Sequence, residues 1–485
     1  MNCIFKQKTL FWCEKLAMLF LCIVMFDSGI FGAGEIIHIG PIGFRQGMLL
    51  LLGFCCIPLF IVKFKEFIKN RFIWVLLIFA MWLGFEAIRG FLNQNPLMHI
   101  DFSGYVYYIF IPLALIVVDS KKKAETLMRT MIYASFVLSL IVIAYLIIYL
   151  VNGSLYDALS VWGLHANFSR IGYITSKIPR IYMISGLYMI AGCAFSIYFA
   201  VTNNIKHFKW IYYITPATCL FATLLSYTRS VFLGFIAAAI FIIGYYVFSL
   251  SKEGRKKLFI HMGSFASLCI IITLSFTFIA GANYIGFAIS RSTVSMESTA
   301  DLDNTSSMNN NSSTSDSSMN NNSSTSDSRV DNTSSENINS SDNHEKQEQE
   351  QINNFNELTH ESDKIRTITV KETIEHIKKS PIIGHGLGFT VPSRSDGNEY
   401  TYLDIWMKLG IVGLVLFLLP IIFMLVKIFK TTKEEEFSKD LKIVWLAFLL
   451  GIMAYSVLNP YITSSLGIFV LGITMAISQN IKKQN

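Results

Sequence analysis

Three arginines lie at the borders of apolar segments, where a charged side chain needs a specific reason to be present. Arg180 precedes one apolar segment, Arg229 lies in the short sequence SYTRS between two others, and Arg366 begins a run compatible with a helix. A guanidinium stays charged at physiological pH, and its planar fork donates paired hydrogen bonds to anions. These residue types at these borders therefore predict that the protein binds an anion.

The composition of the chain determines what kind of protein must position these arginines. Of the 485 residues, 53% are hydrophobic and 15% are charged, compared with about 25% charged residues in soluble domains. The apolar residues occur in long runs separated by short basic loops, which favours a polytopic α-helical membrane protein over a β-barrel. The composition excludes a soluble enzyme, a disordered protein and a fibrous protein.

The net charge of +7 is unevenly distributed along the chain. Residues 297–350 contain eleven acidic and two basic residues, a net −9, so the remainder of the chain carries +16. In a membrane protein such an excess of lysine and arginine first reflects topology. We therefore expect no nucleic-acid partner.

Twelve apolar stretches qualify as transmembrane helices, which need about 20 residues each. They lie at 16–32, 45–62, 72–90, 103–119, 130–151, 182–201, 210–226, 231–250, 260–281, 403–426, 443–459 and 461–480. Lysines and arginines concentrate in alternate loops and at the C-terminus, whereas the loops 33–44, 91–102 and 460–464 contain none. The positive-inside rule therefore places both termini in the cytoplasm.

The same orientation leaves three segments on the outer side of the membrane, at 152–181, 226–230 and 282–402. They carry cations where the positive-inside rule disfavours them. These cations include Arg170, Lys177, Arg180, Arg229, Arg291, Arg366, Lys371, Lys378, Lys379 and Arg394. Anion binding is the interpretation that explains why they are there.

The long outer loop has two parts of different character. Residues 297–353 are rich in Asn, Ser, Thr and Asp, and the unit SSMNNNSSTSD occurs at 306–316 and again at 317–327. Such a tract cannot bury enough apolar surface to fold, so we expect a disordered insert without a catalytic part. Residues 360–402 are expected to be structured, because the run DKIRTITVKETIEHIKK places isoleucines near one helix face before Pro381 ends the helix.

Short motifs recur around the predicted outer segments. After Arg366 comes an amphipathic helix, then the turn P-x-x-G-x-G-x-G at 381–388, then a helix with a G-[IV]-x-G step at 410–413. The sequence SYTRSVFLG surrounds Arg229, and RGFLNQNPL occupies 89–97. In this order, the motifs resemble those of the bacterial O-antigen polymerase and O-antigen ligase superfamily.

The resemblance implies a GT-C-like all-α polytopic membrane protein with about 12 transmembrane helices and one large extracytoplasmic loop between spans nine and ten. The first nine helices would occupy 1–281, the loop 282–402 and the last three helices 403–485. The implied protein lies in the inner membrane and polymerises polyprenyl-pyrophosphate-linked repeat units into surface polysaccharide. Its expected partners are the lipid-linked glycan and the bilayer, with a chain-length regulator membrane protein as a further candidate.

The resemblance also implies roles for individual residues. Breaking the anomeric C–O bond builds negative charge on the lipid pyrophosphate, which fixed cations stabilise in the transition state. Arg229, Arg366 and Arg180 are the expected pyrophosphate-binding residues. The acceptor hydroxyl needs a general base, for which Glu399 is the first candidate and His385 the second. No D-x-D motif occurs in the structured outer segments, so we predict a metal-independent enzyme without a cofactor.

One departure from the family motifs separates its two activities. Ligases of this superfamily usually have a His-Asn pair at the start of the helix after the glycine turn, whereas Glu399-Tyr400 occupies that place in this chain. The missing histidine favours a polymerase, with an O-antigen ligase as the alternative. A transporter or flippase is the alternative from another class, although no internal repeat is visible and the long loop breaks any symmetry between halves.

Structural explanations compete with these roles. Arg229 could simply anchor a helix end, and Glu86 and Arg89, three residues apart, could form an internal ion pair. Asp27 lies inside the first apolar stretch without a recognisable partner, which makes it a functional hypothesis by default. Arg394 belongs to no motif and is expected to be dispensable.

Overall fold

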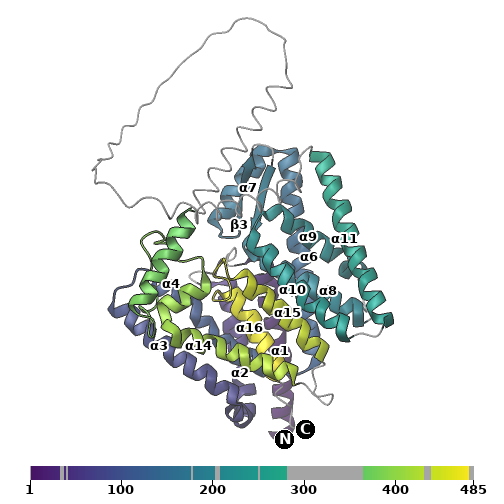
Figure 1. Ribbon diagram of the computed structural model, residues 1–485. Coiled ribbons are helices and arrows are strands. Elements are labelled where there is room, and N and C mark those ends of the chain that lie inside the picture. The colour runs from purple at the N-terminus through teal and green to yellow at the C-terminus, as the bar shows by residue number, and fades with distance from the viewer. Residues whose placement is uncertain are drawn as a thin grey trace, which may run out of the picture. The chain divides into compact units, whose positions relative to one another are not determined.

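The computed structural model in Figure 1 describes eight stretches of the chain: residues 2–32, 38–39, 42–175, 178–202, 208–249, 252–280, 364–430 and 439–479. The chain divides into two compact units, one formed by Met1–Ile285 with Ile365–Asn485 and the other by Gly286–Lys364. The insert predicted to be disordered, 297–353, lies outside the described residues. Residues 365–402 belong to the same unit as the apolar helices.

The first part of the chain folds into long helices. They are α1 (Asn2–Phe31), α2 (Phe44–Lys69), α3 (Arg71–Leu92), α4 (Met98–Val106), which continues through the short 3-10 helix η1 (Tyr107–Ile109) into α5 (Phe110–Val117), and α6 (Lys121–Val151). Two small antiparallel hairpins interrupt the helical pattern. They are β1 (His38–Ile39) with β2 (Ile42–Gly43), and β3 (Ser169–Thr175) with β4 (Ile178–Met183).

The helical pattern continues after α6. The elements are α7 (Gly153–His165), the 3-10 helix η2 (Ile184–Leu187), α8 (Tyr188–Thr202), α9 (Lys209–Ser226), α10 (Arg229–Ser249), α11 (Lys252–Ala280), a loop helix at 364–379, α14 (Thr401–Phe429), α15 (Lys439–Tyr455) and α16 (Ser465–Gln479). Within the described residues, nine helical segments are long and apolar enough to cross a membrane. The prediction of an all-α polytopic membrane protein is therefore confirmed.

Three of the twelve predicted spans differ from these nine segments. The stretches 210–226, 443–459 and 461–480 correspond to α9, α15 and α16, which have 18, 17 and 15 residues. A helix rises 1.5 Å per residue, so 15 residues reach about 22 Å, less than the roughly 30 Å of a bilayer core. The windows 443–459 and 461–480 included loop residues, whereas 210–226 lies wholly within α9. The count of twelve spans remains a prediction.

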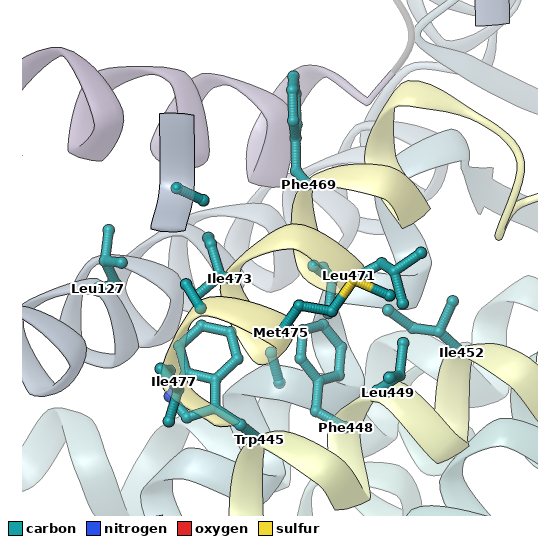
Figure 2. Packing of buried hydrophobic residues seen from close by; sticks show 14 of the residues in the cluster. Leu127, Trp445, Phe448, Leu449, Ile452, Phe469, Leu471, Ile473, Met475 and Ile477 are labelled. Carbon is teal, nitrogen blue, oxygen red and sulfur yellow. The ribbon is translucent and has the colours of Figure 1, made fainter. Parts of the chain in front are cut away.

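The core of the bundle lies around α15 and α16. Figure 2 shows side chains of the two helices interdigitating, with Leu127 of α6 beside them. Trp445 and Phe448 of α15 are fully buried and pack on Phe195 of α8, with ring centroids 4.7 and 5.5 Å apart. Burial on all sides explains why α15 and α16 have no polar face, since both helices are enclosed by other helices.

Candidate functional site

Hydrogen bonds fix the glycine turn, residues 381–388, against the end of α3. The Arg89 guanidinium donates to the carbonyl oxygens of Ile383 (2.8 Å) and Gly384 (3.1 Å). It also donates to both carboxylate oxygens of the fully buried Glu86, at 3.0 and 2.7 Å. The ion pair suggested by the sequence is therefore present, and the same arginine holds the turn.

The glycine turn approaches neighbouring backbone so closely that side chains are excluded. Gly388 has a φ of 78°, and a Cβ atom there would lie 2.0 Å from the backbone nitrogen of Met98. A Cβ atom at Gly90 would lie 2.2 Å from the carbonyl oxygen of Leu387. Only glycine permits such contacts between backbones. The RGFLNQNPL sequence and the glycine turn therefore lie against each other.

The third motif bends α14 around the same turn. Gly410 interrupts the helix with a φ of 68° and a ψ of −179°. The amide of Ile411 then donates to the carbonyl oxygen of Pro381 (2.9 Å) rather than to its own helix. We call this meeting of three motifs the glycine junction, formed by residues 86–98, 381–388 and 407–411.

A cluster of buried charged side chains contacts the glycine junction. Lys408 is 5% exposed, and its Nζ lies 2.8 Å from a carboxylate oxygen of Asp101 and 2.8 Å from one of Asp404. The same Asp101 oxygen accepts a hydrogen bond from the amide of Gly388 (2.8 Å). A buried lysine needs such counter-ions, because an unpaired charge away from water costs several kcal/mol. Charges inside apolar runs were the sequence signal for this cluster, and we had not singled them out.

Glu399 lies between two arginines near the start of the loop helix. Arg366 Nε lies 3.0 Å from Glu399 Oε2, and Arg394 pairs with Glu399 Oε1. Both oxygens of the first candidate base are therefore engaged by guanidinium groups. These contacts give Arg394 a partner that its lack of a motif did not indicate, and the expectation that Arg394 is dispensable stays a prediction. That expectation considered motifs alone, whereas the chain folds back after the glycine turn and brings 394 to 399.

Arg180 joins this group from strand β4. Its Nε donates to the carbonyl oxygen of Ser226 (3.4 Å), in the turn that carries Arg229. Burial lowers the pKa of Arg180, and the nearby positive charge of Arg366 acts in the same direction. The structure therefore links Arg180 to the turn of Arg229, and Arg366 is near enough for its charge to act on Arg180. We call this group the arginine cluster, formed by Arg180, Arg366, Arg394, Glu399 and the turn 226–230.

Arg229 is the first residue of α10, and a hydrogen-bonded turn precedes it. Tyr227 has a left-handed backbone with a φ of 48°. The hydroxyl of Thr228 donates to the carbonyl oxygen of Ser226 (3.1 Å), and the amide of Val231 donates to the carbonyl oxygen of Thr228 (3.1 Å). The side chain of Arg229 is half-buried. Its position is thus set by the turn that also contacts Arg180.

His385 is placed differently from the other candidates. Its Nε2 lies 2.8 Å from the carbonyl oxygen of His376, and its ring stacks on Phe389 with centroids 4.5 Å apart. Its amide donates to the carbonyl oxygen of Met407 (3.0 Å). Among the described residues, the contacts of His385 are with the glycine junction and its surroundings rather than with the arginine cluster.

Asp27, for which the sequence showed no partner, is paired with Arg45. Both Nε and Nη2 of Arg45 lie 2.8 Å from Asp27 Oδ2. Arg45 is 4% exposed and belongs to α2, the helix that packs along α1. The pair therefore links two neighbouring helices, which explains the acidic residue in span one without a substrate.

Three tyrosines beside the arginine cluster had not been anticipated. The hydroxyl of Tyr182 lies 2.8 Å from that of Tyr455 and 2.5 Å from that of Tyr461. The sequence IPRIYM contains one usable signal, because alternation along a strand puts Arg180 and Tyr182 on the same face. No local signal connects Tyr182 with Tyr461, which lies 279 residues further along the chain.

No group of three His, Cys, Asp or Glu side chains within the described residues is arranged to hold a metal ion. Much of the outer loop lies outside those residues. Metal independence is therefore still a prediction, as are the roles of the individual site residues.

Comparison with known proteins adds one finding. Residues 214–418 match the profile of the protein family described as Wzy_C, O-antigen ligase. The matched stretch contains Arg229, Arg366, Glu399 and the glycine turn, and leaves out Arg180 and RGFLNQNPL. No curated protein and no solved structure matches the chain. Over residues 214–418, the chain therefore carries the O-antigen ligase family domain that its motifs resemble.

Proposed function

We propose that the protein is a glycosyltransferase that polymerises polyprenyl-pyrophosphate-linked oligosaccharide units into surface polysaccharide. The observation that carries this proposal is the contact of Arg180 with the turn of Arg229, near the charge of Arg366, in a chain with an O-antigen ligase family domain. Fixed guanidinium groups stabilise the charge that develops on a leaving pyrophosphate, because they need no reorganisation during the reaction. Arg229, Arg366 and Arg180 are accordingly the proposed pyrophosphate ligands.

Glu399 is our first candidate for the general base. Its oxygens pair with Arg366 and Arg394 in the present arrangement, which fixes the carboxylate and places one guanidinium on each oxygen. A pyrophosphate carries more negative charge than one carboxylate and would attract Arg366 away from it. Glu399 Oε2 would then accept the proton of the acceptor hydroxyl. In this scheme, binding of the pyrophosphate-linked donor releases the general base. His385 is the second candidate for the base.

The proposal includes the placement of the chain in the membrane. Twelve spans with both termini in the cytoplasm would put the arginine cluster on the outer face of the inner membrane, where lipid-linked glycans are polymerised. The proposed architecture is GT-C-like, with the loop 282–402 outside the membrane. Its support is the agreement among the basic loops under the positive-inside rule. A chain-length regulator remains a candidate partner.

A ligase that transfers the polymer to a lipid A core is the second candidate function. The family description itself, O-antigen ligase, favours it. One sequence feature favours the polymerase. Glu399-Tyr400 occupies the position, at the start of the helix after the glycine turn, where a ligase usually has a His-Asn pair.

The surface glycan of a deletion strain distinguishes the two functions. Loss of a polymerase should leave at most one repeat unit on each lipid core, as a single short band on a polysaccharide gel. Loss of a ligase should leave the core alone while lipid-linked polymer accumulates in the membrane. An unchanged glycan profile would contradict both functions and favour a transporter of another substrate.

The proposed metal independence has its own test. If guanidinium groups alone stabilise the pyrophosphate, transfer by the purified protein should continue in the presence of a strong chelator. A strict requirement for an added divalent ion would contradict this and reduce the arginines to a supporting role.

A further inference from the structure

The loop between α15 and α16 is hydrogen-bonded to two helices that begin beside the arginine cluster. Asn459 of this loop donates from Nδ2 to the hydroxyl oxygen of Ser230 (2.6 Å), in the first turn of α10. The carbonyl oxygen of Asn459 accepts a hydrogen bond from the hydroxyl of Thr401 (2.9 Å), the first residue of α14. Ser230 and Thr401 are both buried. Asn459 therefore joins the start of α10 to the start of α14.

These two helix starts carry residues proposed for different parts of the reaction. Ser230 directly follows Arg229, a proposed ligand of the leaving pyrophosphate. Thr401 lies two residues after Glu399, the first candidate for the general base. The two helices pack chiefly on different neighbours, α10 along α15 and α14 along α3. The bridge through Asn459 thus links two parts of the bundle whose site residues must act on one substrate.

The bridge has a fixed position because the loop is closed by its own hydrogen bonds. The hydroxyl oxygen of the fully buried Ser456 accepts a hydrogen bond from the amide of Ile462 (3.0 Å). The amide of Tyr461 donates to the carbonyl oxygen of Asn459 (2.8 Å). Pro460 restricts the backbone of the residue before it, which is Asn459. A side chain on such a loop can hold its partners at a set distance, as precise positioning requires.

The same loop also reaches the strand that carries Arg180. The hydroxyl of Tyr461 lies 2.5 Å from that of Tyr182. Tyr182 lies two residues after Arg180 in β4, and residues two apart in a strand point to the same face. The loop is thus hydrogen-bonded beside Arg180 as well as beside Arg229 and Glu399.

We propose that Asn459 is a positioning residue, which sets the place of Arg229 relative to Glu399 during transfer. The inference rests on the proposed function and deepens it, because it gives a loop outside the matched family domain a role in the same site. Stabilisation of the leaving group and removal of the acceptor proton act on one transition state, so a small displacement of one group against the other lowers the rate. Asn459 acts through its neighbours and not by contact with the substrate.

The test is the rate of chain extension by the purified full-length protein, with lipid-linked repeat units extracted from the deletion strain as the probe. Asn459→Ala removes the amide that donates to Ser230 and keeps every proposed ligand of the pyrophosphate. We expect kcat to fall about tenfold or more, because a misplacement of about 1 Å can cost about a hundredfold. The KM for the lipid-linked units should equal that of the wild type, since the ligands themselves are unchanged.

A double-mutant cycle shows whether the effect passes through this hydrogen bond. Ser230→Ala removes the acceptor and should lower kcat as much as Asn459→Ala does. The double variant should be no slower than either single variant, because the same contact can be lost only once. Ser230→Ala also tests the inference if the loop does not tolerate Asn459→Ala.

Tyr402→Phe is the matched control. The hydroxyl of Tyr402, also in the first turn of α14, donates to the carbonyl oxygen of Met453 in α15 (3.0 Å). The variant therefore removes one hydrogen bond from the same helix start and keeps the bridge to α10. Its kcat and KM should equal those of the wild type. Asn459→Ala and Tyr402→Phe should show similar small decreases in Tm, so that only the loss of kcat separates them.

Four outcomes would overturn the inference while the wild type still extends chains. They are an unchanged kcat in both Asn459→Ala and Ser230→Ala, a rise in KM in place of the fall in kcat, an equal loss of kcat in Tyr402→Phe, and losses that add in the double variant. These outcomes would leave the proposed function standing. A wild type that forms no polymer from lipid-linked repeat units would instead contradict the proposed function, and this inference with it.

Discussion

The glycine junction and the arginine cluster are held together by different kinds of contact. In the junction, backbone touches backbone at Gly388, and the buried Lys408 has two carboxylate partners. In the arginine cluster, Arg180 lies beside the like charge of Arg366, and Glu399 is shared between two guanidinium groups. The junction pairs its buried lysine with carboxylates of its own, whereas the cluster carries an excess of positive charge.

This difference assigns the two regions different tasks. A region with close backbone contacts and a buried charge paired by its own carboxylates is suited to be a support. A region that gathers like charges opposes its own folding and is stabilised by an anion. The loop helix 364–379 connects them, since it carries Arg366 near its start and leads into the glycine turn at its end. We infer that the junction positions Arg366.

Breaking the junction should have the largest effect. Gly388→Ala places a Cβ atom against the backbone of Met98 in a left-handed conformation. The clash and the backbone strain together should destabilise the protein by about 2–5 kcal/mol, with loss of polymer and of membrane-inserted protein. Polysaccharide gels and immunoblots of a complemented deletion strain measure both.

Gly53→Ala in α2 is the control for this change, since a Cβ atom at Gly53 would meet nothing within 4 Å. It should leave protein level and polymer unchanged. Normal polymer from the Gly388→Ala variant would contradict the supporting role of the junction.

Conservative changes in the arginine cluster should have the next largest effect, and on activity alone. Arg229→Lys and Arg366→Lys keep the charge but lose the planar fork that binds phosphate oxygens in pairs. Each should reduce the rate of polymer formation about a hundredfold or more, at a normal membrane level. Long chains in the Arg229→Lys strain would show that Arg229 only anchors α10.

A smaller effect on polymer formation is expected from a change at the partly exposed side of the arginine cluster. Arg394→Ala removes one partner of Glu399, but the side chains are 24% and 27% exposed, so the pair contributes little to stability. We expect the rate of polymer formation to fall about tenfold or less, because Glu399 keeps its contact with Arg366 and is only less firmly positioned.

Lys371→Ala is the matched control for Arg394→Ala. Lys371 is exposed on the loop helix and has no ion pair among the described residues. Its removal should be silent. Equal polymer in the two variants would mean that Arg394 does not position Glu399, as the sequence had suggested.

The fold and the site were accessible from sequence to different degrees. Long apolar stretches such as 130–151 predicted α6, because a membrane span is defined by local composition. The enclosed helices α15 and α16 were also predicted as membrane spans, since burial in protein and burial in lipid both favour apolar residues. The β3–β4 hairpin was missed because its strands contain few apolar residues in a row.

In the site, residues that belong to a motif were found and residues that complete it from elsewhere were not. Arg229 and Arg366 lie in recognisable motifs, and the spaced glycines of the glycine turn indicate close backbone contacts. The contact of Lys408 with Asp101 and the contact between Tyr182 and Tyr461 depend on segments far apart in the chain. One sequence contains no signal for such pairs, because only the packed fold brings them together.

The smallest effect is expected from the largest change. Deleting residues 300–350 removes the Asn- and Ser-rich tract, which lies outside the described residues and outside both regions compared above. The entropic cost of closing a loop depends only weakly on its length and changes by about 0.6 kcal/mol for each doubling. Polymer amount and length should therefore equal those of the wild type on the same gel. Loss of polymer from an inserted, normally abundant deletion variant would show that the tract takes part in transfer, and the arginine cluster would then be only one part of the site.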